Sequence, residues 1–112
     1  MTTAHLDEVA LRMTAEAGAD ALFKGVRSPH VRRPFPGAIC ASVNDEVVHG
    51  IPGKRVLNEG DIVGLDFGAI VDGYFGDAAR TVAVGKVSPE AERLMRVTQQ
   101  SLHRAIEAAR PG

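Results

Sequence analysis

A long predicted β-hairpin in the second half of the sequence constrains the fold of this chain more than any other feature. Two segments rich in apolar and β-branched residues, Asp61–Val71 and Tyr74–Val84, are separated only by Asp72-Gly73, a pair typical of a tight hairpin turn. Alternate apolar residues of the first segment share one face and are expected in the core: Val63, Leu65 and Phe67. This alternation fixes the register, because a slip of one residue would turn the apolar side chains away from the core.

One helix is predicted before the strands in the sequence and another after them. Near the N-terminus, apolar residues at helical spacing run over Leu6–Ala17, and Thr2 or Thr3 is placed to cap that helix. A final helix is expected to follow Ser88, another good capping residue. Its expected buried stripe consists of Leu94, Thr98, Leu102, Ala105, Ile106 and Ala109.

Between the first helix and the hairpin, the sequence predicts a loop and two shorter strands. Phe23–Pro36 contains three prolines and is predicted to be irregular. Its basic part, Arg27 to Arg33, is expected to be a solvated loop, with contact to an acidic partner such as ribosomal RNA as the alternative. Ala38–Val43 predicts a strand, and Val47–His49 a short returning strand. The fold class is therefore α+β, an antiparallel sheet with flanking helices.

Composition narrows the possible functions. The 112 residues, of which 45% are hydrophobic, predict one small globular domain over residues 1–112. A net charge of -1 does not favour specific binding of nucleic acid or of an anionic membrane. No apolar run approaches the roughly 20 residues needed to span a bilayer. With no recognisable secretory signal and a lone cysteine, Cys40, a cytoplasmic location is expected.

Two carboxylates of the hairpin are expected to face the same side. With the turn at Asp72-Gly73, Gly68 pairs with Asp77 and Asp66 pairs with Ala79. Asp66 and Asp77 then become diagonal neighbours, roughly 7–8 Å apart, on the face opposite the core residues. Two such carboxylates repel each other unless positive charge lies between them. Two divalent metal ions bridged by the carboxylates would relieve the repulsion and activate a water for hydrolysis.

These residues alone leave two interpretations open. Asp is common near turns, where Asp77 can bond the local backbone, so the pair can be purely structural or solvated. The other interpretation is the metal site. In either case the metal-free pair should disfavour double ionisation, which raises the pKa of one carboxylate.

Three runs of the sequence resemble type 1 methionine aminopeptidases: Phe35–Pro52, Glu59–Asp66 and Asp72–Thr81. The most specific signal is Val48-His49-Gly50-Ile51-Pro52, with Asp66 lying 17 residues beyond the histidine and Asp77 a further 11 residues on. The related prolidases and type 2 enzymes lack this form of the histidine segment. The resemblance extends over nearly the whole chain and implies about one half of a pita-bread fold.

The resemblance also implies roles for individual residues. Asp66 and Asp77 correspond to ligands of two divalent metal ions of the Co, Mn, Fe, Zn or Ni class, with Asp77 bridging both ions. His49 corresponds to a residue that contacts the substrate near the scissile bond. Phe35 and Cys40 correspond to residues that line the pocket for the methionine side chain. On residue type alone, Phe35 fits plain core and Cys40 an inert buried thiol equally well.

The chain also departs from the family pattern. Phe75 stands where the family commonly has histidine before the Gly-Asp pair. Family members are more than twice as long, so the resemblance implies a partial methionine aminopeptidase domain truncated at both ends. An opening helix, a metal-binding His, a second catalytic His and two metal-binding Glu have no counterpart here, so no complete catalytic set is expected. His103 matches no family ligand and is expected to face solvent.

Two functions follow from the resemblance. The first is metal-dependent removal of N-terminal methionine from nascent peptides, with the ribosome as a partner of the full-length family and the isolated chain inactive. The alternative is a non-catalytic remnant of the pita-bread family that acts as a binding module or has no function. In both cases a half-domain should expose apolar surface and tend to self-associate through it.

Overall fold

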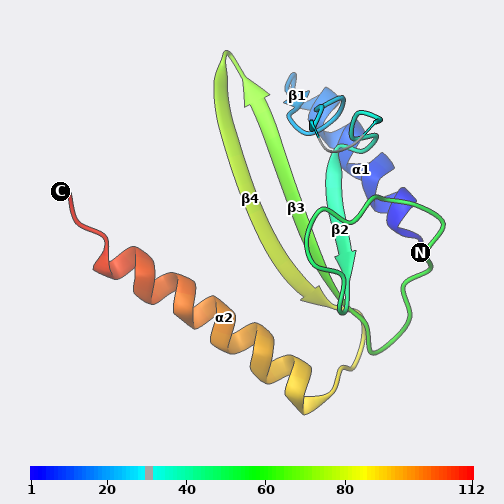
Figure 1. Cartoon of the computed structure of the whole chain (residues 1–112). Coiled ribbons are helices and arrows are strands. Elements are labelled where there is room, and N and C mark those ends of the chain that lie inside the picture. The colour runs from blue at the N-terminus through cyan, green and yellow to red at the C-terminus, as the bar shows by residue number, and fades with distance from the viewer. Residues whose placement is uncertain (30–31) are drawn as a thin grey trace.

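The computed structural model describes residues 1–29 and 32–112, and its elements follow the predicted order (Figure 1). The elements are α1 (Thr3–Glu16), β1 (Asp20–Ala21), β2 (Ile39–Val43), β3 (Ile62–Val71), β4 (Tyr74–Ala83) and α2 (Pro89–Ala108). Within the described residues the four strands form one antiparallel sheet. The predicted α+β class is therefore confirmed. No helix in this described part is long and apolar enough to cross a membrane.

Strand β3 lies at the centre of the sheet. On one side it pairs with β4 along its whole length, from Ile62 opposite Ala83 to Val71 opposite Tyr74. On its other side β2 pairs with residues 63–67 and the short β1 with residues 69–70. At the turn between β3 and β4, the φ angles of Asp72 and Gly73 are +51° and +81°, as a tight hairpin turn of type I′ requires. The predicted hairpin and its register are confirmed.

The core lies between α1 and one face of the sheet. Its buried centre consists of Ile39, Ala41, Val43 and Val63. Partly buried residues from both helix and sheet pack against this centre: Leu6, Ala10, Leu57, Leu65, Phe67, Val82 and Val84. The predicted core face of β3 therefore faces α1, and the alternate residues of β2, β3 and β4 lie on the opposite face.

Two polar side chains of α1 tie the helix to distant parts of the chain. Asp7 Oδ1 accepts hydrogen bonds from Ala38 N at 2.7 Å and Ile39 N at 3.1 Å, where β2 begins. Thr3, only 2% exposed, donates from Oγ1 to Gly53 O at 3.1 Å and accepts from Gly53 N at 2.9 Å. The helix thereby holds both the start of β2 and the loop that follows β2.

The apolar stripe of α2 is exposed rather than buried. After β4 the chain turns and α2 runs away from the sheet (Figure 1). Leu94, Leu102 and Ile106 are 58%, 57% and 63% exposed, and Thr98, Ala105 and Ala109 are exposed as well. The predicted buried stripe is wrong for this chain, because no other described segment packs against that face of the helix. The predicted exposure of apolar surface is confirmed.

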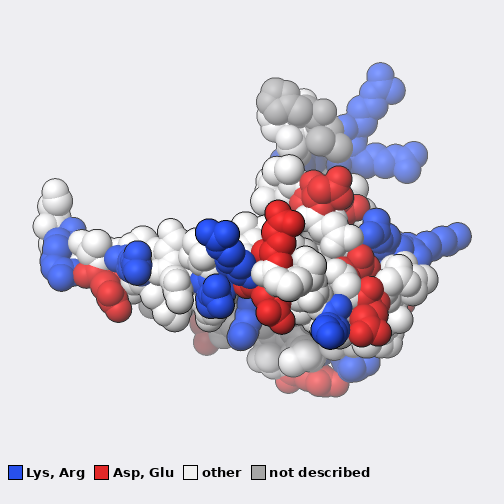
Figure 2. Space-filling model, turned by 90° about the horizontal axis from the view of Figure 1, so that it is seen from below, with Lys and Arg blue, Asp and Glu red and all other residues white. Residues whose placement is uncertain are grey.

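Charged side chains are mixed over the surface. Figure 2 shows Lys and Arg interspersed with Asp and Glu, both on the body of the molecule and along α2. In the predicted basic loop, Arg27, Arg32 and Arg33 are exposed, while His30 and Val31 lie outside the described residues. Strand β1 was not predicted, because its two residues are too few to show an alternating pattern.

Candidate metal centre

Asp66 of β3 and Asp77 of β4 lie on the sheet face opposite α1. Asp77 pairs with Gly68 and Asp66 pairs with Ala79, so the two carboxylates are diagonal neighbours, as predicted. Burial is the largest cause of a raised pKa of Asp66, followed by the charge of Asp77 and a hydrogen bond between the two side chains. The predicted rise in the pKa of one carboxylate is confirmed, although burial contributes more to it than repulsion does.

Cys40 forms the β2 side of this face. It is the direct cross-strand partner of Asp66, and its residue is 5% exposed. Burial, followed by the negative charges of Asp66 and Asp77, raises the pKa of the Cys40 thiol. A thiol with a raised pKa stays protonated and is a poor nucleophile or soft-metal ligand. The structure therefore fits Cys40 as a wall of the site.

His49 is an exposed residue of the loop that follows β2. The φ angles of Val48 and His49 are +37° and +54°, so the predicted short strand Val47–His49 is wrong. A left-handed conformation is a genuine outlier for β-branched Val48, and such strain costs on the order of 1–3 kcal/mol per residue. The charge of His49 lowers the pKa of Asp66, as the smallest of the causes that act on it and in opposition to the others.

Gly50 fixes this loop against β2. Its N–H donates to Ser42 Oγ at 3.1 Å, and its carbonyl accepts from Ala41 N at 2.9 Å. A Cβ atom at position 50 would collide with the Ala41 carbonyl and lie 2.9 Å from Ser42 Cα. The loop can approach the strand this closely only because residue 50 is glycine.

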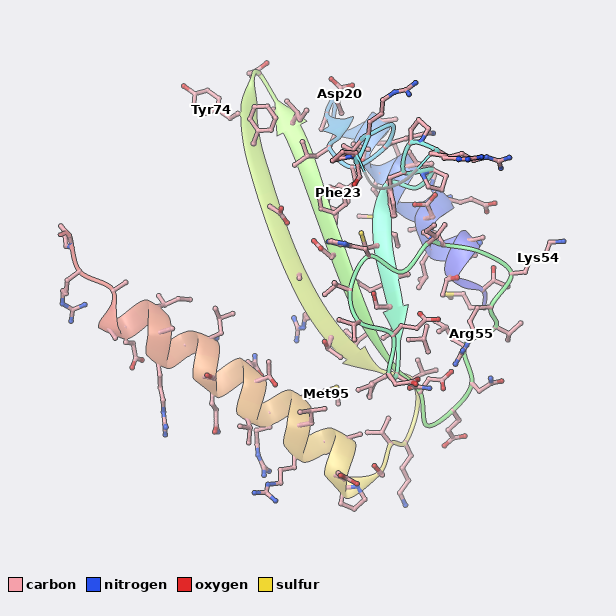
Figure 3. The ribbon with its side chains drawn as sticks, in the orientation of Figure 1. Asp20, Phe23, Lys54, Arg55, Tyr74 and Met95 are labelled. Carbon is pink, nitrogen blue, oxygen red and sulfur yellow. The ribbon has the colours of Figure 1, made fainter. Side chains whose placement is uncertain are left out.

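Leu22 and Phe23 border the carboxylate face near Gly68, whereas Phe35 lies in the loop that precedes β2. Phe35 is half-buried in the loop before β2, where its backbone bonds Gly25 and Val26 at 2.8 Å each. A Cβ on Gly68 would lie 2.7 Å from Leu22 Cδ2 and 3.0 Å from Phe23 Cε1. Phe23 thus packs over β3 beside Gly68, the cross-strand partner of Asp77 (Figure 3). Sequence reasoning missed Leu22 and Phe23, although a glycine inside a strand is a signal of close approach.

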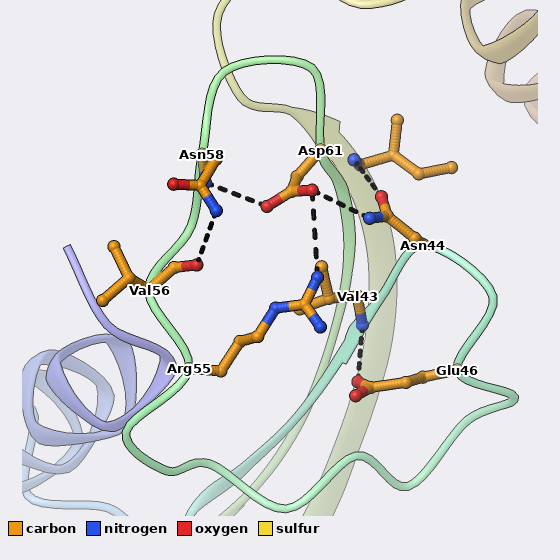
Figure 4. A network of polar contacts seen from close by, with 8 residues as sticks. Val43, Asn44, Glu46, Arg55, Val56, Asn58 and Asp61 are labelled. Atoms are coloured by element: carbon orange, nitrogen blue, oxygen red, sulfur yellow. Dashed lines mark hydrogen bonds and ion pairs between the residues drawn. The ribbon is translucent and has the colours of Figure 1, made fainter.

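A separate polar network orders the loops at the far end of β3 (Figure 4). Asp61, 9% exposed, accepts from Asn44 Nδ2 at 2.8 Å and Asn58 N at 2.9 Å, and Arg55 Nη2 lies 3.9 Å away. The Asn58 backbone bond, then the Asn44 amide, lower the pKa of Asp61, and burial partly opposes them. Asn44 Oδ1 also accepts from Ile62 N at 3.0 Å, which joins the β2 turn to the start of β3. This network is structural.

The donor set fits only part of a metal centre. Asp66 and Asp77 supply oxygen donors suited to hard and borderline divalent ions. Among residues 1–29 and 32–112, no group of three or more His, Cys, Asp or Glu side chains is arranged to hold a metal ion. His103 is exposed on α2, as predicted. The carboxylate pair is therefore compatible with a metal ion but does not by itself form a closed site.

Comparison with known proteins identifies the class to which this arrangement belongs. The model of metallopeptidase family M24 matches residues 1–112, and the chain belongs to that family. Its curated relatives include the methionine aminopeptidase of Aquifex aeolicus, 49% identical over 113 aligned residues that cover 100% of this chain and 44% of the relative. Methionine aminopeptidase 1 of Bacillus subtilis is 45% identical over 112 residues, covering 100% of this chain and 43% of that protein.

Solved structures of the same kind share the fold. The crystal structure of methionine aminopeptidase from Rickettsia prowazekii superposes with a TM-score of 0.88 at 36% identity, covering 100% of this chain and 43% of that one. The enzyme from Thermotoga maritima gives a TM-score of 0.89 at 38% identity, with 99% and 43% coverage. The predicted family and the predicted half of a pita-bread fold are confirmed. The chain spans less than half the length of these relatives.

Proposed function

We propose that this chain carries one half of the dinuclear metal centre of a methionine aminopeptidase, an enzyme that removes N-terminal methionine from nascent peptides. The observation that carries the proposal is the placement of Asp66 and Asp77 on one sheet face, the face that α1 does not cover. The membership in metallopeptidase family M24 and the methionine aminopeptidase relatives support it. The proposed location is the cytoplasm, since the lone Cys40 fits a reducing compartment.

Each residue has a defined part in this proposal. Asp66 and Asp77 would be the residues of this chain that hold the divalent ions. When bound, the ions supply Lewis-acid chemistry for peptide hydrolysis. His49 donates a hydrogen bond to the substrate near the scissile bond and orients it. Phe35 and Cys40 line the pocket for the methionine side chain, which needs an apolar wall and no reactive thiolate.

The chain alone is proposed to have little or no activity. Two carboxylates cannot close a dinuclear site, and the described residues contain no third ligand in place. The same observation favours the second candidate function, a non-catalytic member of the family that binds a partner. The two candidates differ in whether further ligands reach this sheet face from another chain. The ribosome is a proposed partner only for the complete enzyme.

Metal binding gives the first test. The purified chain is titrated with Mn²⁺ or Co²⁺ by calorimetry, and bound metal is quantified after gel filtration. We expect weak binding that is lost in Asp66→Asn and Asp77→Asn. Asp45→Asn, in the exposed turn after β2, is the matched control and should bind like the wild type. Equal metal binding by the wild type and all three variants would place the metal elsewhere and refute Asp66 and Asp77 as its ligands.

Hydrolysis of a Met-Ala-Ser peptide gives the second test. The chain alone should release little methionine with either metal, and robust turnover that disappears in Asp77→Ala would refute the proposed inactivity. The segment of the Aquifex aeolicus relative that lies beyond the matched region is then added in trans. Methionine release that requires both Asp66 and Asp77 would favour the enzyme. Stable association without release would favour the binding module.

A further inference from the structure

We propose that Ser42 is a positioning residue, whose hydroxyl holds the loop that presents His49 to the Asp66–Asp77 pair. The importance of that presentation rests on the proposed function of His49. The hydrogen bond that Gly50 N donates to Ser42 Oγ at 3.1 Å is present in the structure whatever the function of His49.

The position of Ser42 in β2 gives its hydroxyl this role. Ser42 pairs with Gly64 and Cys40 pairs with Asp66, so Ser42 lies two residues along β2 from Cys40 on the carboxylate face. Its hydroxyl therefore reaches the loop from the face where the site is built. The Ala41 N–H bonds the Gly50 carbonyl at 2.9 Å, so both polar groups of the Gly50 backbone are held by adjacent residues of one strand.

The loop needs such a restraint because its backbone is strained. Val48 and His49 both have positive φ, and Val48 is a β-branched residue in that region. Strained residues persist where the surrounding structure over-determines them. Here the loop is held at Gly50 by β2 and, three residues later, at Gly53 by Thr3 of α1. The Ser42 bond holds the Gly50 N–H, the backbone group that directly follows His49, so its loss should loosen the backbone that carries the imidazole.

A conservative variant can separate this role from simple packing. Ser42→Ala removes the acceptor, whereas Ser42→Thr keeps a hydroxyl and adds one methyl group. The cross-strand partner of Ser42 is Gly64, which has no side chain to meet the added methyl. Ser101→Ala is the matched control, since Ser101 is an exposed serine of α2 far along the chain from the loop.

The first measurement uses NMR spectroscopy of the full chain without metal or peptide. In Ser42→Ala we expect the Gly50 amide to exchange about tenfold faster, as for loss of one hydrogen bond. The strong intraresidue HN–Hα contact that marks the left-handed His49 should weaken. Ser42→Thr should restore both signals, and Ser101→Ala should match the wild type. Unchanged signals in Ser42→Ala, or faster exchange throughout β2 and β3, would overturn the positioning role.

The second measurement uses Mn²⁺ as a paramagnetic probe. Mn²⁺ held by the carboxylate pair should broaden the His49 ring signals in the wild type and in Ser42→Thr, and less so in Ser42→Ala. Equal broadening in all three proteins would overturn the proposal that Ser42 directs His49. Mn²⁺ binding that survives in the Asp66→Asn variant would instead refute the proposed metal ligands, and it would leave the exchange result at Gly50 to decide the role of Ser42.

Discussion

The side chains of Asp66 and Asp77 leave neighbouring antiparallel strands diagonally, on the sheet face that α1 does not cover. Without a counter-ion this arrangement opposes folding, because burial and the charge of Asp77 raise the pKa of Asp66. A site that is unfavourable when empty and favourable when a cation is bound is typical of functional carboxylates. Replacing either carboxylate should therefore stabilise the metal-free chain and weaken its binding of metal.

Asp66→Asn should raise the stability of the metal-free chain at pH 7, by a few degrees in Tm. The pKa of the Asp66 carboxyl in the folded chain lies above its ordinary value of 3.8, so the protonated carboxyl favours folding. This contribution to stability is complete below pH 3.8 and is lost as the pH rises through the folded pKa. The gain from Asp66→Asn should therefore shrink as the pH falls toward 3.8. Thermal unfolding across this pH range measures it, with Asp45→Asn as the exposed control. A lower Tm for Asp66→Asn at neutral pH would contradict the argument.

Asp61→Asn should have the opposite effect. The pKa of Asp61 is lowered by hydrogen bonds to Asn58 and Asn44, so its contribution to stability is present above the ordinary value of 3.8 and is lost as the pH falls through the lower folded pKa. The variant should unfold several degrees below the wild type at pH 7, and the gap should narrow in acid. Asp20→Asn, on an exposed residue, should unfold like the wild type. A gap that does not change with pH would mean that the carboxylate charge is irrelevant here.

Two glycines of the sheet region should respond differently to alanine. Gly50→Ala places a Cβ against the β2 backbone and should cost about 1–3 kcal/mol or more, as for overpacking. Gly76→Ala, on exposed β4, meets nothing within 4 Å and should be neutral or slightly stabilising. Chemical denaturation of both variants measures the difference. Comparable free energies of unfolding for the two variants would show that the loop is free to move off the strand.

The exposed stripe of α2 should govern self-association. The double variant Leu102→Glu/Ile106→Glu should sediment as a smaller species than the wild type and bind less hydrophobic dye. Its stability should stay within about 0.5 kcal/mol, since both side chains are largely exposed. The variant Gln99→Glu/Gln100→Glu adds the same charge to other exposed positions of α2 and serves as the control. A wild-type chain that is already a compact monomer without dye binding would exclude association through this stripe.

The hairpin could be predicted because its signals are local. The alternation of Val63, Leu65 and Phe67 and the turn residues Asp72-Gly73 fix both the register and the side on which each carboxylate lies. The family could be predicted from three sequence runs. The placement of the carboxylate pair thus required no information beyond the sequence.

The features that could not be predicted depend on contacts between distant residues. Val47 and Val48 have the composition of a strand, but Val48 and His49 adopt positive φ angles in the loop that Gly50 joins to β2. The pattern of α2 indicates that one face is apolar, and it says nothing about what covers that face. The two residues of β1 form a strand only because residues 69–70 of β3 are available to pair with them.

The pairing of Thr3 with Gly53 has a consequence for how the chain folds. These residues are 50 positions apart, and the Asp7 bonds to Ala38 and Ile39 span 31 and 32 positions. Helix α1 has only 14 residues, so it is a marginal helix until those distant segments arrive. The local hairpin can close within microseconds, whereas docking of α1 must wait for long loops to close. We expect the hairpin to form early in the folding reaction, and the docking of α1 on β2 to limit its rate.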